Sequence, residues 1–288
     1  MYPEIHLFGL RIYPYGIMMG LGIVLAMTIF QKKCKAIGYD EDSTLNMAIV
    51  CVLSGLLGAK LLFWITEAGA VIKDPVYYIK NIGDGFVLYG AVIGGVLAGY
   101  LYTKAKKWNF LKVFDIALPL IAMGQGLGRI GCFFSGCCYG KETSAPWGIV
   151  FKNSPFAPNG VKLIPTQLIS SLADFMIFGI LLWFDGKKKS RDGQTGALYL
   201  ILYSIGRFII EFFRGDPRGT VFDVLSTSQF ICIFVFAAGL MLLYSIHKRE
   251  GINVHEDDIS ISEKEKEMRI DKAGSQSDEQ IQDANKGK

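Results

Sequence analysis

Charged side chains interrupt several long apolar stretches of this 288-residue chain. They are Lys60 in LLGAKLLFW, Arg129 in GQGLGRIGCFF, and Arg207, Glu211 and Arg214 in LYSIGRFIIEFFRGD. A charge at the centre of a membrane helix costs about 2.5–3.5 kcal/mol on insertion scales, so such residues are functional-site hypotheses by default. Guanidinium groups suit an anion, because each donates several hydrogen bonds in a fixed planar geometry. The sequence therefore predicts an anion-binding site at membrane depth.

The last of these stretches carries a polar stripe. On a helix with 3.6 residues per turn, four of its side chains fall within about 80° of one another: Tyr203, Arg207, Glu211 and Arg214. The stripe could line a functional site. It could also be structural, with Arg207 paired to Glu211 four residues later and Arg214 extended to the outer headgroups. Both interpretations stay open at the level of the sequence.

Arg129 differs from the stripe because no acidic residue lies near it in the sequence. It stands instead among glycines, which are Gly124, Gly126, Gly128, Gly131, Gly136 and Gly140. Glycines permit close helix packing, or they break a helix and expose backbone N–H groups. Backbone donors beside a guanidinium make a phosphate site. We therefore expect Arg129 and Arg207, on two different helices, to clamp one phospholipid head group.

Three cysteines cluster directly after this glycine-rich segment. Cys132, Cys137 and Cys138 do not follow a standard zinc spacing, and the histidines are distant in sequence. Those histidines are His6, His247 and His255. We therefore expect no metal site and no cofactor. Small-residue packing is the default role for the three thiols, and a redox or acyl-carrying role for Cys137 or Cys138 stays open.

The elements that must position these residues are membrane helices. The chain is 51% hydrophobic, and its mean hydropathy is +0.34. A bilayer core of about 30 Å needs roughly 20 apolar residues in a helix. Runs of that kind cover residues 12–30, 45–66, 86–103, 113–134, 166–184, 195–213 and 228–246. The expected fold is all-α, a polytopic membrane protein with about seven transmembrane helices.

The loops between these runs predict the orientation. Lysine and arginine concentrate in QKKCK, TKAKKWNFLK, DGKKKSR and HKRE, which follow alternate runs. By the positive-inside rule, the N-terminus lies outside and the C-terminus in the cytoplasm. Residues 1–249 would form the membrane domain, and the polar segment 250–288 a disordered cytoplasmic tail. The net charge of +4 is small and gives no indication of a nucleic-acid partner.

Over about residues 1–246, the chain resembles prolipoprotein diacylglyceryl transferase, an enzyme of the bacterial inner membrane. The resemblance rests on short elements at six places: Tyr15-Gly16, GAK at 58–60, GRIG at 128–131, PTQL at 165–168, Tyr203 with Arg207, and Glu211 with Arg214. The family usually has GAR at the second of these. The GRIG element and the Y-x-x-x-R-x-x-x-E-x-x-R element are specific in combination.

The resemblance implies transfer of diacylglycerol from phosphatidylglycerol to the lipobox cysteine of prolipoproteins, with release of glycerol phosphate. This is a step of lipoprotein biosynthesis in the bacterial cell membrane. The residues that match the family's catalytic positions are Arg129, Arg207, Glu211 and Tyr89. The residues that would bind the lipid substrate are Arg129, Tyr15, Tyr203, Arg214, Gly128, Gly131 and Lys60.

The chain departs from the family pattern at four positions. Cys132 and Cys137 occupy places where an asparagine and an acidic residue are usual, and Tyr89 and Ile164 replace histidines. Tyr89 could relay a proton, or it could be a packing residue at the membrane interface. Two other functions therefore stay open: a related lipid-group transferase with a different acceptor, and a non-catalytic phospholipid-binding protein.

Overall fold

The computed structural model describes residues 5–7, 10–216, 219–221 and 224–248. The chain divides into two units, residues 1–240 and residues 241–288. Of the second unit, the structure describes only residues 241–248, which are helical. The predicted disordered tail, 250–288, lies outside the described residues.

Each of the seven predicted runs coincides with a helix over most of its length. The helices are α1 (Pro14–Ala36), α2 (Glu41–Thr66), α5 (Leu88–Ala105), α6 (Phe110–Ser135), α7 (Thr166–Lys187), α8 (Gln194–Glu211) and a C-terminal helix, Thr227–Lys248. Among the described residues, five helices are long and apolar enough to cross a membrane: α1, α2, α6, α7 and the C-terminal helix. This confirms a polytopic membrane protein. Helices α5 and α8, of 18 residues each, are outside that group, so the count of seven spans stays a prediction.

The connections between the helices carry short elements. Helices α3 (Ala68–Lys73) and α4 (Pro75–Lys80) follow α2. Three antiparallel hairpins pair β1 (Ile5–Leu7) with β2 (Leu10–Ile12), β3 (Ile149–Val150) with β4 (Lys162–Leu163), and β5 (Thr220–Val221) with β6 (Leu225–Ser226). These strands are two or three residues long, so the described fold is all-α with small hairpins at its loops.

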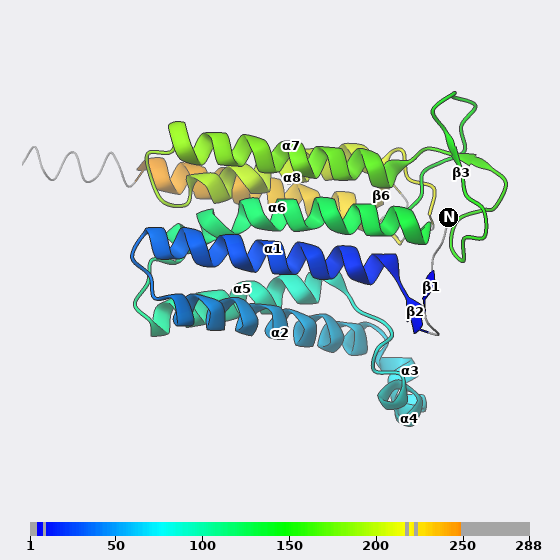
Figure 1. Cartoon of the computed structure of the whole chain (residues 1–288), viewed down its shortest axis with the longest axis horizontal. Helices are drawn as coiled ribbons and strands as arrows, with labels where there is room; N and C mark the ends of the chain where they lie inside the picture. The colour runs from blue at the N-terminus through cyan, green and yellow to red at the C-terminus, as the bar shows by residue number, and fades with distance from the viewer. Residues whose placement is uncertain (1–4, 8–9, 217–218, 222–223, 249–288) are drawn as a thin grey trace, which may run out of the picture. The chain divides into compact units, whose positions relative to one another are not determined.

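The long helices of the first unit pack side by side in neighbouring pairs. Helix α2 packs on α5, α1 on α6, and α6 on α7 (Figure 1). Glycines allow the closest contacts. A Cβ on Gly58 of α2 would collide with the carbonyl of Gly90 on α5, and a Cβ on Gly22 of α1 would lie 3.4 Å from Gly124 of α6. Close backbone approach through small residues is typical of helices packed in a membrane.

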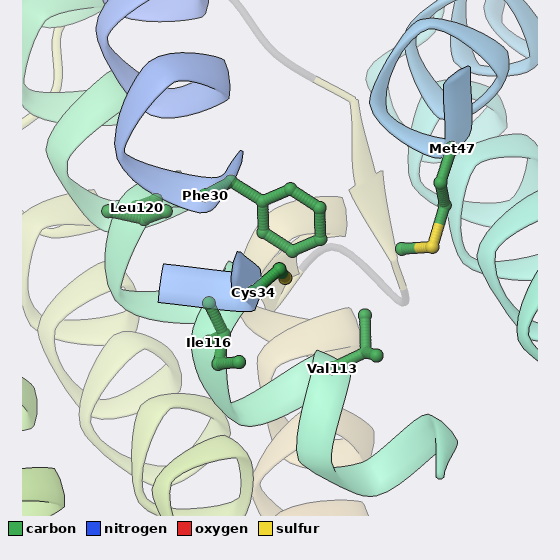
Figure 2. Packing of buried hydrophobic residues seen from close by; sticks show 6 residues of the cluster. All are labelled: Phe30, Cys34, Met47, Val113, Ile116 and Leu120. Carbon is green, nitrogen blue, oxygen red and sulfur yellow. The ribbon is translucent and has the colours of Figure 1, made fainter. Parts of the chain in front are cut away.

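A buried apolar cluster joins α1, α2 and α6 (Figure 2). Phe30 and Cys34 of α1 contribute to it, together with Met47 of α2. Val113, Ile116 and Leu120 of α6 complete the buried set. Many apolar side chains on the outer faces of the helices are exposed, such as Leu57 at 64% and Ile65 at 69%. Such outward apolar surface is what helices in contact with lipid require.

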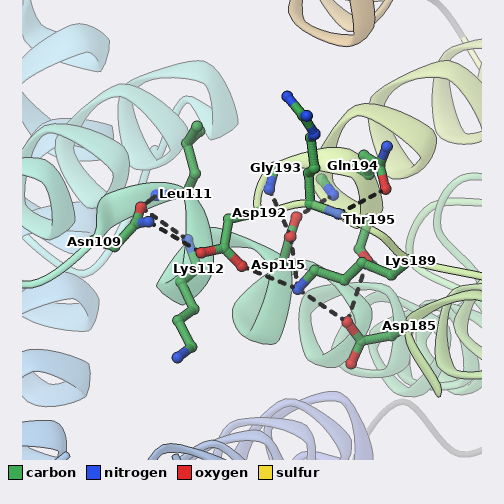
Figure 3. Close-up of polar contacts among 12 residues, drawn as sticks. Asn109, Leu111, Lys112, Asp115, Asp185, Lys189, Asp192, Gly193, Gln194 and Thr195 are labelled. Atoms are coloured by element: carbon green, nitrogen blue, oxygen red, sulfur yellow. Dashed lines mark hydrogen bonds and ion pairs between the residues drawn. The ribbon is translucent and has the colours of Figure 1, made fainter. Parts of the chain in front are cut away.

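A second, polar cluster ties α6 to the start of α8 (Figure 3). The fully buried carboxylate of Asp115 accepts hydrogen bonds from the backbone N–H groups of Gly193 and Gly196, both at 2.7 Å. It also pairs with Lys189 Nζ at 2.9 Å. Burial opposes the charge on Lys189, but hydrogen bonding to Asp115 and the nearby carboxylates raise the lysine pKa overall. Asp115 therefore caps α8 and fixes its N-terminal end against α6.

Candidate functional site

A pocket forms where α6, α7 and α8 meet. It combines charged and polar side chains inside otherwise apolar helices. Its lining consists of Arg129, Ser170, Ala173, Asp174, Ile177, Tyr203, Gly206, Arg207 and Ile210. The structure thus brings together three of the predicted site residues from two helices: Arg129, Tyr203 and Arg207. Two guanidinium groups and a phenol thus face one pocket, and guanidinium groups are donors suited to an anion.

Arg207 is held by two partners on different helices. Its guanidinium pairs with Glu211, one turn later on α8. It also donates a hydrogen bond to Ser228 Oγ at 2.9 Å, on the C-terminal helix. The predicted Arg207–Glu211 pair is therefore confirmed. This pairing does not remove Arg207 from the pocket, which it lines together with Tyr203.

Asp174 supplies the acidic partner that Arg129 lacks in the sequence. It lies on α7, is 7% exposed and lines the same pocket. Its carboxyl group is close enough to interact electrostatically with both Arg129 and Arg207. Asp174 is not among the site residues predicted from the sequence. The available signal was a single acid within the apolar run 166–184, the same signal that identified the arginines.

Arg214 does not continue the polar stripe. Helix α8 ends at Glu211, and Arg214 lies beyond it, in an isolated bridge with Gly140. The prediction that Arg214 shares a helix face with Tyr203 is therefore wrong, because the chain leaves the helical path first. The outward extension of Arg214 is wrong too. Its side chain is 3% exposed and donates to both carboxylate oxygens of Asp216, at 2.8 and 2.9 Å.

The glycines near Arg129 act through helix packing. Helix α6 is continuous from Phe110 to Ser135, so the predicted alternative of a break in this segment is wrong for the glycines within the helix. A Cβ on Gly128 would lie 3.1 Å from Met19 Sδ, and one on Gly131 would lie 3.1 Å from the ring of Tyr15. Both glycines therefore admit α1 close to α6. Tyr15 is placed against the helix that carries Arg129.

Two other predicted site residues lie away from this pocket. Lys60 of α2 is buried, and its Nζ donates to the carbonyl of Asp84 at 2.5 Å. The same ammonium group lies 5.0 Å from the ring of Phe63 and 5.1 Å from that of Phe86. Lys60 thus holds the loop before α5. Tyr89 lies in the first turn of α5 and is not among the residues that line the pocket.

The three clustered cysteines meet in space. Their sulfur atoms all lie within 4.8 Å of one another. The thiols are free, and Cys137 Sγ donates to the carbonyl of Cys132 at 3.7 Å. Hydrogen bonds from Cys132 and Cys137, followed by the charge of Arg214, hold the pKa of the Cys138 thiol well below its usual range. Hydrogen bonding within the cluster raises the pKa of Cys137.

Sequence comparison places the chain among known proteins. Residues 4–245 match the family described as Prolipoprotein diacylglyceryl transferase. The phosphatidylglycerol–prolipoprotein diacylglyceryl transferase of Clostridium tetani is 50% identical over 236 residues, which cover 82% of this chain and 94% of that protein. The second such transferase of Clostridium perfringens is 49% identical over 245 residues, 85% of this chain and 94% of that protein.

A more distant relative shows the same correspondence. The phosphatidylglycerol–prolipoprotein diacylglyceryl transferase of Clostridioides difficile is 37% identical over 258 residues, which cover 87% of this chain and 97% of that protein. The match therefore extends over nearly the whole length of each relative, including the helices that form the pocket. The chain belongs to the prolipoprotein diacylglyceryl transferase family.

Proposed function

We propose that the chain transfers the diacylglyceryl group of phosphatidylglycerol to the cysteine thiol of prolipoproteins, with Arg129 and Arg207 binding the lipid phosphate. The observation that carries this proposal is that both arginines, from α6 and α8, line one pocket. Relatives about half identical to this chain have this activity in their names. Glycerol phosphate is the second product.

The reaction requires charge to build up on the leaving phosphate. The sulfur of the prolipoprotein cysteine attacks the glycerol carbon, a sulfur–carbon bond forms, and the carbon–oxygen bond to phosphate breaks. The electron pair of that bond goes to the phosphate oxygen. Guanidinium donors fixed in a site shielded from water stabilise such charge far more than they would in bulk water.

The substrate thiol must also lose its proton, which the released glycerol phosphate can take up. A free cysteine has a pKa of about 8.5, and neighbouring cations favour the thiolate. Arg129 and Arg207 would supply these cations in the pocket. The same two residues thereby assist both the nucleophile and the leaving group.

The neighbours of the arginines support a preorganised site. Glu211 and Ser228 hold the guanidinium of Arg207 through an ion pair and a hydrogen bond. The carboxyl group of Asp174 interacts electrostatically with both arginines, so an acid accompanies the two cations before the lipid enters. Fixed donors avoid much of the reorganisation that a mobile side chain would require.

The arrangement of loops supports the orientation in a bacterial cytoplasmic membrane. Within the first unit, the α1–α2, α5–α6 and α7–α8 connections lie at one end of the long helices, and α3, α4 and β3 lie at the other (Figure 1). The lysine-rich segments QKKCK, TKAKK and GKKKSR lie at or next to these connections. Excess lysine and arginine favour the cytoplasmic side. On this basis we infer seven spans, with the cysteine cluster on the outer side.

Radiolabelled transfer provides the direct test. Purified protein is mixed with phosphatidylglycerol labelled in its acyl chains and with a lipobox peptide, and label on the peptide is measured. The wild-type chain should label a cysteine peptide and leave its cysteine-to-serine counterpart unlabelled. Arg129→Ala and Arg207→Ala should each reduce the rate by about 100-fold or more, as for loss of one donor to a charged transition state.

Arg191→Ala is the matched control, because Arg191 lies in the turn before α8, outside the pocket lining. This variant should keep the wild-type rate. Full activity in Arg129→Ala or Arg207→Ala would contradict the phosphate clamp. A well-folded wild-type protein that labels no cysteine peptide would instead favour a different acceptor or a binding role.

A further inference from the structure

The three cysteines at the end of α6 form a compact group of soft ligands that the proposed transfer does not use. Within the described part of the chain, no other group of three or more His, Cys, Asp and Glu side chains converges this closely. The sulfurs of Cys132, Cys137 and Cys138 lie within 4.8 Å of one another. Metal–sulfur bonds of about 2.3 Å place two sulfurs on one ion roughly 4 Å apart. The cluster therefore needs little adjustment to enclose an ion.

The backbone brings the thiols together through a fixed turn. Gly136 ends α6 with a φ of 72°, and a Cβ there would collide with the side chain of Ser154. Cys138 also has a positive φ, 60°, which costs a residue with a Cβ about 1–2 kcal/mol. This turn folds the later cysteines back toward Cys132 at the end of the helix. Sequence spacing alone does not reveal this convergence.

Helix α7 also stabilises this turn, through two side-chain hydrogen bonds. Gln167 Nε2 donates to the carbonyl of Cys137 at 2.8 Å, and Thr166 Oγ1 donates to that of Cys138 at 2.9 Å. Gln167 and Thr166 are each 1% exposed, so both hydrogen bonds are sheltered from solvent. The positions of the thiols are thus fixed by the packing of α6 against α7.

We propose that Cys132, Cys137 and Cys138 bind one thiophilic metal ion, Cu⁺ or Zn²⁺, through three sulfur ligands. Thiolates select these soft ions over Mg²⁺ and Ca²⁺, which prefer oxygen. Three thiolates around either ion carry a net negative charge. The guanidinium groups of Arg214 and Arg129 interact electrostatically with the cysteine cluster, so two cations offset that charge. The inference is independent of the proposed transfer.

Metal retention by the purified full-length protein tests the site. Reduced protein in detergent, prepared without oxygen, is incubated separately with Cu⁺ and with Zn²⁺. Weakly held ions are then removed with a competing chelator. We expect about one ion per chain, with sulfur ligands in the X-ray absorption spectrum of the metal. Cys132→Ser, Cys137→Ser and Cys138→Ser should each lower retention at least tenfold.

The remaining cysteines provide the control. A variant with Cys34→Ser, Cys51→Ser and Cys232→Ser changes the same number of thiols outside the cluster, and it should retain the ion. Cys137 and Cys138 lie beyond α6, so their variants test the site even if Cys132→Ser disturbs the helix. Failure of the wild-type protein to keep either ion would overturn the proposal. So would equal loss in the control variant.

Discussion

Asp174 of α7 and Arg129 of α6, 45 residues apart in the sequence, face the same pocket and interact electrostatically. Arg207 approaches this carboxylate from α8. One acid thus interacts electrostatically with two cations on separate helices. This relationship makes Asp174 the residue whose removal most directly tests how the charges of the pocket are balanced.

Asp174→Asn should destabilise the protein in the absence of lipid. The change removes an acid that interacts electrostatically with two buried guanidinium groups, and a buried charge is costly without compensation. Phosphatidylglycerol should recover more stability in the variant than in the wild type, because its phosphate replaces the missing charge. Thermal unfolding in detergent, with and without the lipid, measures both effects. Asp174→Glu keeps the carboxylate and serves as the control. An equal stabilisation by lipid in Asp174→Asn and in the wild type would contradict a role for Asp174 as counter-charge.

Tyr89→Phe should retain transfer activity within about twofold and keep the wild-type pH profile. The residue lies in the first turn of α5, outside the lining of the pocket, so loss of its hydroxyl should not affect the reacting atoms. Tyr203→Phe removes a hydroxyl from the pocket itself and should lower the rate about tenfold, the size typical of one lost hydrogen bond. A strong loss in Tyr89→Phe with an altered pH profile would support the proton-relay hypothesis.

Lys60→Met should lower the stability of the protein without changing the KM for phosphatidylglycerol. The ammonium group donates to the carbonyl of Asp84, and a hydrogen bond from a charged group contributes about 1.5–3 kcal/mol. Lys73→Met is the control, because Lys73 is exposed at the end of α3. Unfolding in detergent and lipid-dependent kinetics separate the two roles. A raised KM for phosphatidylglycerol with unchanged stability would instead indicate that Lys60 binds the substrate.

Gly58→Ala should separate α2 from α5. The added Cβ would meet the backbone carbonyl of Gly90, and neither backbone can yield without shifting its helix. Overpacking of this kind costs about 1–3 kcal/mol. Gly20→Ala on α1 is the matched control, since nothing lies within 4 Å of its Cβ. The free energy of unfolding in detergent should fall only for Gly58→Ala, and an equal effect at Gly20 would rule out the steric explanation.

Much of the helical architecture could be predicted from the sequence. Both the hydropathy and the length of a membrane helix must match the apolar core of the bilayer. The run predicted at 113–134 is α6, Phe110–Ser135, and the run at 166–184 is α7, Thr166–Lys187. The positions of Arg129 and Arg207 within such runs also identified two residues of the pocket. Each inference depends only on residues close together in the chain.

The features that were not predicted from the sequence depend on long-range packing or on local breaks in helical periodicity. Asp174 faces the arginines only because α7 packs against α6 and α8. Arg214 left the polar stripe because α8 ends three residues earlier, at Glu211. The cysteine cluster depends on a left-handed residue, Gly136, which reverses the chain after α6. Helical periodicity contains no information about any of these.

The buried cap formed by Asp115 has a mechanical consequence for the pocket. Hydrogen bonds from Gly193 and Gly196 to Asp115 join α6 to the first turn of α8, so the two helices are held together at this point. Arg129 lies on α6 and Arg207 on α8, so this buried cap also constrains the two helices that carry the arginines of the pocket.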